Sequence, residues 1–272
     1  MSIEVTLCIT TYNRREKFEA CLESFLKSNV YPWEKLELIV VDNGSTDPSA
    51  LDLLHNMKLD IFGSFTRIIN GKNDYPYCLR RAKNQARAIA RGKYFIDCPD
   101  DQLFVVKYDW ISEIIRFLES SEEKISCVCH YAYPQYRFYK SANKIQVSSV
   151  DENFFTTPLK GYADYHVMKK ETYEDIGKYD ETLEFSPNSE SDYMLRSKEK
   201  GYKRALYKFP VSILIDKDTG WRGKYAILDA PLDGDSVRFS VDLKRPLTNE
   251  ELTRMVIDSD CLKVRNLPAG ID

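Results

Sequence analysis

Acidic side chains follow two apolar segments that have the composition of buried strands. Asp42 ends one such segment, and Asp97, Asp100 and Asp101 end another. Like charges repel, so carboxylates gather in one place only where a cation or a donor-rich ligand compensates them. Mg²⁺ and Mn²⁺ prefer oxygen ligands and are commonly held by one or two carboxylates together with substrate phosphates. We therefore expect Mn²⁺ or Mg²⁺ at the Asp100–Asp101 pair, whereas Asp42 by itself fits a turn residue equally well.

The elements that position these acids alternate between strand and helix. Strands are expected at 4–11, 36–41, 65–69 and 94–97, and helices at 14–27, 48–57 and 79–91. This alternation predicts an α/β fold with a doubly wound sheet and helices on both faces. In such sheets ligands bind at the carboxyl ends of the strands, which places function at 10–13, 42–47, 70–84 and 98–102. No glycine-rich phosphate loop follows any of these strands, so phosphate must be held by other means.

The composition is typical of a folded protein and argues against binding to polyanions. The 272 residues carry 39 Lys and Arg against 42 Asp and Glu, a formal net charge of −3. No basic excess is present to cover nucleic acid, and no apolar run approaches the roughly 20 residues of a membrane span. Seven cysteines, an odd number, and the lack of a signal-peptide pattern predict a cytoplasmic protein. Any association with the cytoplasmic face of a membrane would be peripheral.

Four segments have the order, spacing and strand context of a known family. They are residues 5–14 (VTLCITTYNR), 38–47 (LIVVDNGSTD), 82–94 (AKNQARAIARGKY) and the Asp100–Asp101 pair. Together they resemble the N-terminal half of family-two glycosyltransferases of the GT-A fold, and the resemblance covers residues 4–215. It implies a GT-A-like, mostly parallel but mixed sheet and a transferase that uses a nucleotide-sugar donor.

The resemblance implies that the end of the first strand and the end of the second bind the nucleotide. The residues are Thr11, Tyr12, Arg14 and Asp42. A carboxylate at Asp42 can accept the N–H of a uracil or thymine ring. We therefore expect a UDP- or dTDP-sugar as the donor.

The third helical segment contributes further nucleotide-binding candidates. Asn84 matches an asparagine of the family, which a basic residue commonly accompanies. Arg81 and Lys83 both fit that description, and the sequence does not choose between them. A solvent-exposed helix face would account for these residues as well.

The metal motif departs from the family pattern, which is usually Asp-x-Asp. Counting from Gly92, Pro99 takes the place of the first aspartate. The resemblance therefore implies Asp101 as the metal ligand and Asp100 as the residue nearer the sugar or ribose, while Asp97 ends the strand. A divalent ion on the diphosphate would stabilise the charge of the leaving group without a proton transfer.

The second half of the chain supplies a candidate base. Residues 189–196 (SESDYMLR) open an expected helix, after a short helix at 171–176 that Gly177 stops. The family typically has Glu-Asp-x-Asp-Leu-x-x-Arg here, which implies Glu190 as the catalytic base. Such a base would take the acceptor hydroxyl proton while attack proceeds from the face opposite the diphosphate, with inversion. A glutamate in the first turn of a helix is also an ordinary stabilising feature.

We expect one GT-A-like domain followed by an extension. The expected divisions are a domain at 1–215, made of a nucleotide-binding half at 1–104 and an acceptor-side half at 105–215, and an extension at 216–272. Segment 132–160 is the expected acceptor-facing insertion. Asp216 or Asp218 could add a metal ligand, or Arg222 a phosphate contact. The extension, with a strand pattern at 236–241 and a capping box at Thr248, is expected to cover the core edge or a partner subunit of a homo-oligomer.

These residues favour a metal-dependent inverting glycosyltransferase. It would move a sugar from a UDP- or dTDP-sugar to a hydroxyl of a saccharide or lipid-linked acceptor, as in polysaccharide biosynthesis. The departures at Pro99 and Ser189 leave one alternative, a catalytically inactive protein of the same fold that binds nucleotide sugar or carbohydrate. A sugar-nucleotide pyrophosphorylase would need a glycine-rich loop after the first strand, and residues 10–14 contain no glycine.

Overall fold

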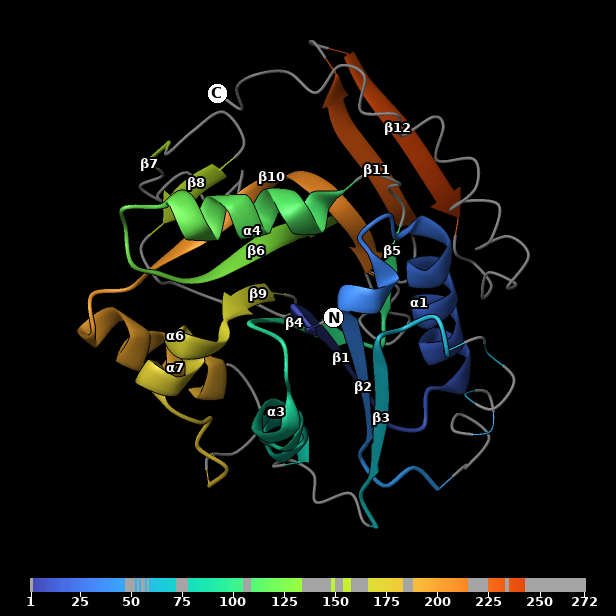
Figure 1. The fold of residues 1–272 in the computed structure, drawn as a ribbon. Coiled ribbons are helices and arrows are strands. Elements are labelled where there is room, and N and C mark those ends of the chain that lie inside the picture. The colour runs from blue at the N-terminus through green and yellow to red at the C-terminus, as the bar shows by residue number, and fades with distance from the viewer. Residues whose placement is uncertain are drawn as a thin grey trace.

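The computed structural model describes residues 2–46, 52, 54, 57, 59–71, 78–104, 109–133, 148–149, 154–157, 166–182, 188–214, 225–232 and 235–242. The first half alternates strands and helices (Figure 1) as β1 (Val5–Thr11), α1 (Arg15–Ser28), the 3-10 turn η1 (Trp33–Lys35), β2 (Leu36–Asp42), β3 (Ser64–Ile69), α3 (Cys78–Ile89) and β4 (Tyr94–Pro99). The second half contains β5 (Gln102–Phe104), α4 (Trp110–Ser120), β6 (Ile125–Tyr133), β7 (Ser148–Ser149), β8 (Phe154–Thr157), β9 (His166–Lys169), α6 (Lys170–Ile176), α7 (Asn188–Glu199), β10 (Lys203–Leu214), β11 (Tyr225–Leu232) and β12 (Asp235–Asp242). Of the helix expected at 48–57 only residues 52, 54 and 57 are described, and 52 and 54 are helical. Most of the insertion expected at 132–160 lies outside the described residues.

Ten of the described strands form one mixed sheet. Its order is β3-β2-β1-β4-β9-β6-β10-β8-β7, with β5 paired to β10. The first four strands are parallel, and β9 runs antiparallel to both β4 and β6. The expected doubly wound, mostly parallel but mixed sheet is confirmed. Because β2 and β4 flank β1 on opposite sides, the carboxyl ends of β1 and β4 meet at the topological switch point, where open α/β sheets bind ligands.

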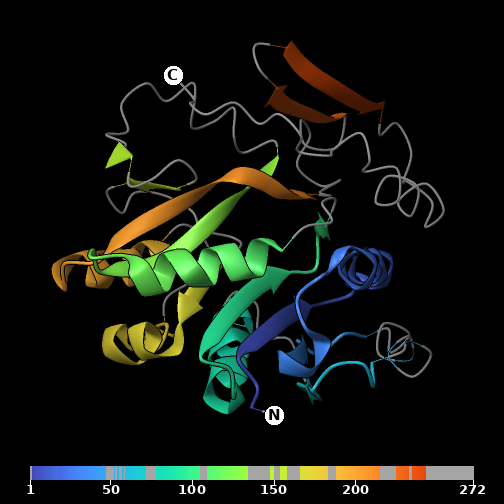
Figure 2. The same cartoon turned by 45° about the horizontal axis from the view of Figure 1, so that its top comes forward.

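Helices cover both faces of this sheet. β1 and β2 are buried along their whole length, and alternate residues of a strand face opposite sides. On one side Leu7 and Ile9 belong to the same core cluster as Phe25 of α1 and Ile111 of α4. On the other side Cys8 clusters with α3, α6 and α7 residues. Figure 2 shows α4 lying across the strands of the second half. The helices therefore pack on the two faces of the sheet, and the loops that follow the parallel strands lie at one end of it.

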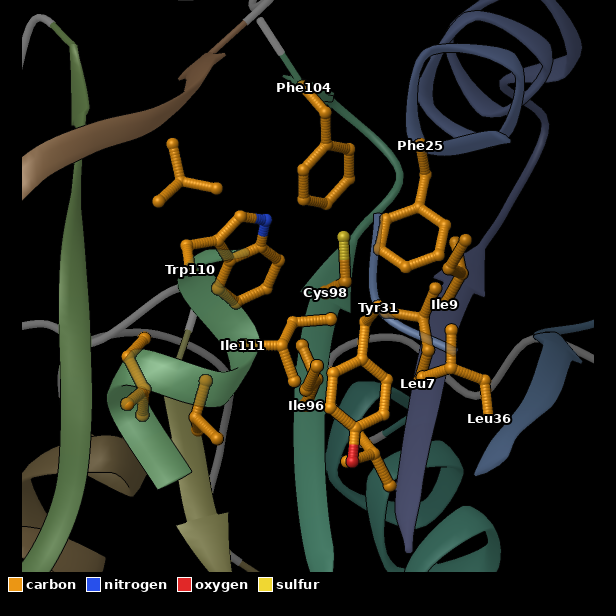
Figure 3. Packing of buried hydrophobic residues seen from close by; sticks show 14 of the residues in the cluster. Leu7, Ile9, Phe25, Tyr31, Leu36, Ile96, Cys98, Phe104, Trp110 and Ile111 are labelled. Carbon is orange, nitrogen blue, oxygen red and sulfur yellow. The ribbon is translucent and has the colours of Figure 1, made fainter. Parts of the chain in front are cut away.

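The short strand β5 fixes the turn that carries Asp100–Asp101. The backbone N–H of Phe104 donates to the Ser24 hydroxyl of α1 at 3.0 Å. The Phe104 ring packs edge to face on Phe25 at 5.0 Å and stacks on Trp110 at 6.2 Å (Figure 3). The sequence does not predict β5, because three residues show no periodicity and their pairing with β10 is long-range. The acidic turn is thus held on both sides, by β4 and by β5.

The chain beyond β10 contributes a separate pair of strands. β10, in the large sheet, ends at Leu214, and β11 and β12 pair antiparallel in a sheet of their own. The strand expected at 236–241 falls within β12. Asp216, Asp218, Arg222 and the helix expected from Thr248 lie outside the described residues. Among the helices that the structure describes, none has both the length and the apolar character needed to cross a membrane.

Candidate active site

The ends of β1 and β2 place Thr11 beside Asp42. Their backbones pair in register, and both side chains are buried. Oδ1 of Asp42 accepts from the Ser45 N–H at 3.0 Å and from its hydroxyl at 2.6 Å, which closes a turn of the Asx type. Both hydrogen bonds from Ser45 are accepted by Oδ1, so among the described residues they leave Oδ2 available as an acceptor. Tyr12, the next residue after β1, is 39% exposed.

Asn13 joins the loops that follow β1 and β2. Its backbone has φ 49°, the left-handed region that asparagine tolerates better than most residues. Its N–H donates to the Ser45 hydroxyl at 2.9 Å, and its Oδ1 accepts from the Thr46 N–H at 2.8 Å. Asn13 is therefore a positioning residue. In the sequence Asn13 stands out only as part of the motif at 5–14, and its place at a strand-to-helix turn is the signal that points to this role.

Asp100 and Asp101 lie in the turn between β4 and β5, next to Arg14. Nη1 of Arg14 is 3.4 Å from Oδ1 of Asp100 and 3.5 Å from Oδ2 of Asp101. Burial raises the pKa of Asp100, and the positive charge of Arg14 opposes that rise. The loop after β1 and the acidic turn therefore lie next to each other, as expected, and Arg14 contacts both carboxylates.

The acidic turn fits a divalent cation. Oδ2 of Asp100 is buried, and among the described residues no hydrogen bond of good geometry reaches it, although the nearby Thr11 side chain opposes the rise in the pKa of this carboxyl. A buried carboxylate oxygen without a donor is costly unless an ion or another ligand satisfies it. In the same part of the chain no three His, Cys, Asp or Glu side chains gather as metal ligands. The protein would thus offer one or two carboxylates, and phosphate oxygens would supply further ligands.

Asn84 of α3 makes four interior hydrogen bonds. Its side-chain N–H groups donate to the Tyr179 carbonyl at 3.0 Å and to Glu181 Oε1 at 2.8 Å. Its Oδ1 accepts from the Tyr179 N–H and from the Tyr173 hydroxyl, both at 3.1 Å. Both donors and both acceptor positions of the amide are thereby used. These contacts favour a positioning role, and the nucleotide contact expected for Asn84 stays a prediction.

The two basic candidates on α3 differ in their surroundings. Lys83 is buried, with Nζ 3.2 Å from Oδ2 of Asp97, a fully buried residue within β4. Arg81 has a side chain that is 42% exposed, and its Nε lies 3.8 Å from Oε2 of Glu181. Arg81 is therefore the candidate whose charged group lies nearer the solvent. Nucleotide binding by either residue stays a prediction.

The charge cluster around Asp97 was missed by the sequence reasoning. Asp97 Oδ2 lies 3.4 Å from Nη2 of Arg87 and 3.6 Å from Nε2 of His166. The guanidinium carbon of Arg87 lies 4.4 and 4.6 Å from the ring centroids of Tyr173 and Tyr179. The sequence indicates that Arg87 is buried, because it lies next to the small residues of a helix face that must pack on the sheet. The cluster ties β4 and β9 to α3.

Glu190 lies in the first turn of α7, as the sequence predicts. Its side chain is outside the described part of the chain, so its catalytic role stays a prediction. Arg196, further along α7, donates to the carbonyls of Ile176 at 2.8 Å and Lys178 at 2.9 Å. The end of α6 and the start of the following loop, residues 176–181, are thereby held to α7 by Arg196 and to α3 by Asn84. This double attachment links the helix of the candidate base to the half that carries the acidic turn.

Comparison with known proteins identifies similar sequences. The family model for glycosyl transferase family 2 matches residues 6–177. The UDP-Glc:alpha-D-GlcNAc-diphosphoundecaprenol beta-1,3-glucosyltransferase WfaP of Escherichia coli is 30% identical over 127 residues, which are 47% of this chain and 46% of that protein. An uncharacterized glycosyltransferase of Haemophilus influenzae is 28% identical over 118 residues, 43% of this chain and 33% of its own. The chain thus spans less than half the length of these two curated relatives.

Solved structures share the fold. The mannosyltransferase PcManGT from Pyrobaculum calidifontis, in complex with GDP-Man and Mn²⁺, matches 81% of this chain and 60% of its own with a TM-score of 0.60 and 22% identity. GalNAc-T7 with UDP, GalNAc and Mn²⁺ matches 82% of this chain and 45% of its own, with a TM-score of 0.60 and 15% identity. The expected GT-A architecture is confirmed by these matches.

Proposed function

Because the chain belongs to glycosyl transferase family 2, we propose that it transfers a sugar from a nucleoside diphosphate sugar to an acceptor hydroxyl, with a divalent metal and with inversion. One observation carries this proposal. Thr11, Arg14 and Asp42 lie at the same end of the parallel strands as the Asp100–Asp101 turn, where the buried carboxylate of Asp100 stands next to that of Asp101. This is the place where an α/β sheet binds a nucleotide.

The nucleoside is held at the ends of β1 and β2. Ser45 occupies Oδ1 of Asp42 and so orients the carboxylate, whose Oδ2 accepts the ring N–H of a uracil or thymine. Tyr12 is exposed beside it and offers an aromatic surface for the base. A UDP- or dTDP-sugar is therefore the donor that this pair suits. The Escherichia coli relative is named for UDP-Glc, which supports the same base.

The diphosphate is held at the acidic turn. Asp101 is the proposed metal ligand and Asp100 the neighbour nearer the ribose or sugar. A bound Mn²⁺ or Mg²⁺ supplies charge neutralisation to the departing diphosphate. The turn itself is fixed by β4 and β5, so the carboxylates are in place before the donor arrives.

The acceptor is activated from α7. Glu190 takes the proton of the acceptor hydroxyl, whose oxygen forms a bond to the anomeric carbon as the bond from that carbon to the diphosphate breaks. The nucleoside diphosphate leaves with the bonding electron pair, and the configuration is inverted. The acceptor is a saccharide or lipid-linked saccharide, and the diphosphoundecaprenol-linked acceptor in the name of the Escherichia coli relative supports the lipid-linked choice. We place this activity in a domain of about residues 1–215.

The test is nucleoside diphosphate release from a panel of UDP- and dTDP-sugars with Mn²⁺ and lipid-linked acceptors. Asp101→Asn should lower kcat/KM by about a hundredfold or more, and Glu190→Gln should lower kcat by about 10²- to 10⁴-fold. Matched controls are Asp60→Asn and Glu199→Gln, which make the same changes at exposed positions. Full turnover in Asp101→Asn and Glu190→Gln would overturn the site assignment. Metal-dependent UDP binding without turnover on any acceptor would instead favour the inactive alternative.

A further inference from the structure

A single nitrogen of Arg14 lies between the two carboxylates of the acidic turn. Nη1 is 3.4 Å from Oδ1 of Asp100 and 3.5 Å from Oδ2 of Asp101. The two carboxylates are 6% and 13% exposed, whereas the arginine side chain is 41% exposed. The guanidinium is therefore the more exposed partner of these ion pairs, and the charge of Lys17 also acts on Asp100.

The main chain at Arg14 is held, while its side chain is long and exposed. Asn13 is fastened to Ser45 and Thr46 of the neighbouring loop, and α1 begins at the next residue, Arg15. In contrast, the guanidinium reaches the carboxylates through a flexible stem, whose rotamers interconvert without a change in the backbone. Arg14 can therefore leave the acidic pair while its Cα stays in place.

A dication and a guanidinium compete for the space between the same two carboxylates, because they repel each other at contact distance. Arginine forms paired, charge-assisted bonds with phosphate as readily as with carboxylate. We propose that Arg14 exchanges partners: it is the counter-cation of Asp100 and Asp101 in the nucleotide-free protein, and it moves to the diphosphate when the metal and nucleotide bind. This inference rests on the proposed function and adds to it an order of events at the same site.

The exchange has a thermodynamic consequence. Metal alone must displace Arg14 without giving it a new partner, so it binds weakly. When a diphosphate is present, the displaced guanidinium gains the phosphate oxygens, so each ligand improves the affinity of the other by the same factor. Removal of Arg14 therefore acts in opposite directions on the two ligands. A residue that only supported the fold of the turn would weaken both.

The test is titration of the full chain with Mn²⁺, with and without UDP. The free ion is measured at each point by electron paramagnetic resonance. Arg14→Gln should bind Mn²⁺ alone about threefold to tenfold more tightly than wild type, the worth of one or two ion pairs with one exposed partner. The same variant should lose most of the increase in Mn²⁺ affinity that UDP produces. Arg14→Lys keeps the charge and should show near wild-type affinity for Mn²⁺ alone. Arg15→Gln is the matched control, since it removes an equal charge one residue away.

Two results separate the failure of this inference from the failure of the proposed function. If Arg14→Gln is folded by circular dichroism and binds Mn²⁺ no more tightly than wild type, or if it keeps the full effect of UDP, the exchange is wrong. If Asp101→Asn binds Mn²⁺ as wild type does, with or without UDP, the proposed metal site itself fails. Tighter Mn²⁺ binding together with weaker coupling to UDP supports the exchange.

Discussion

The buried carboxylate of Asp97 gives the most demanding test of how the fold is held together. Its Oδ2 lies 3.2 Å from Lys83, 3.4 Å from Arg87 and 3.6 Å from His166. Asp97→Asn keeps the shape of the side chain and removes its charge. Two buried basic side chains, Lys83 and Arg87, then lose the carboxylate that faces them. The variant should therefore be strongly destabilised.

The expected loss follows from the burial of this cluster. Removing one partner of a buried ion pair costs about 3–5 kcal/mol, because the remaining charge is left uncompensated in a poorly polarisable interior. For chains of 150–250 residues each kcal/mol lowers the melting temperature by roughly 2–4 °C. Asp97→Asn should accordingly melt roughly 6–20 °C below wild type.

The pH dependence of the stability has a defined sign. Burial alone raises the pKa of Asp97, but Lys83, His166 and Arg87 lower it below the ordinary value of 3.8. A carboxyl whose folded pKa is lowered stabilises the fold at pH values above 3.8, and this stabilisation is lost as the pH falls through the folded pKa. The difference in stability between wild type and Asp97→Asn should therefore shrink on acidification below pH 3.8.

The assay is urea and thermal denaturation followed by circular dichroism, with Asp175→Asn as control. Asp175 makes the same kind of pair with Lys200, but its side chain is 46% exposed, so its loss should cost much less stability than the loss of the Asp97 charge. The double variant Asp97→Asn, Lys83→Met should recover part of the stability, because it also removes the buried positive charge of Lys83, which no longer faces a carboxylate. The reasoning is refuted if Asp97→Asn loses no more stability than Asp175→Asn.

Two further outcomes are expected. Asn84→Ala strands the Tyr179 amide and carbonyl and the Tyr173 hydroxyl, so urea denaturation should show a loss of about 3 kcal/mol; an unchanged midpoint would mean that these groups find other partners. Chelation with EDTA should abolish nucleoside diphosphate release and added Mn²⁺ should restore it, because the neighbouring carboxylates of Asp100 and Asp101 fit a divalent ion. Turnover that persists in EDTA would exclude the proposed metal dependence.

Much of the first half of the fold could be predicted because its signals are local. The apolar run at Leu36–Val41 lies within one strand and the helical spacing at Phe18–Leu26 lies within one helix. β2 and α1 begin and end within one residue of the expected bounds, 36–41 and 14–27. The start of α7 and the end of α6 at Gly177 could also be predicted from local signals, and Gly177 has φ 94°. β5, β7 and β8 could not be predicted, because strands of two to four residues acquire their structure from partners far along the chain.

The sequence by itself determined the types of chemistry: acids at two strand ends, a base candidate at a helix start, and no glycine-rich phosphate loop. Only the tertiary structure decided which groups meet. Arg14 and Asp100 are 86 residues apart, and Asn84 and Glu181 are 97 residues apart. Their contacts depend on the order of strands in the sheet, which local periodicity does not encode. For this reason the sequence does not reveal that Arg14 contacts the acidic pair or that Asn84 contacts Tyr179 and Glu181, and the nucleotide binding expected of Arg14 and Asn84 stays a prediction.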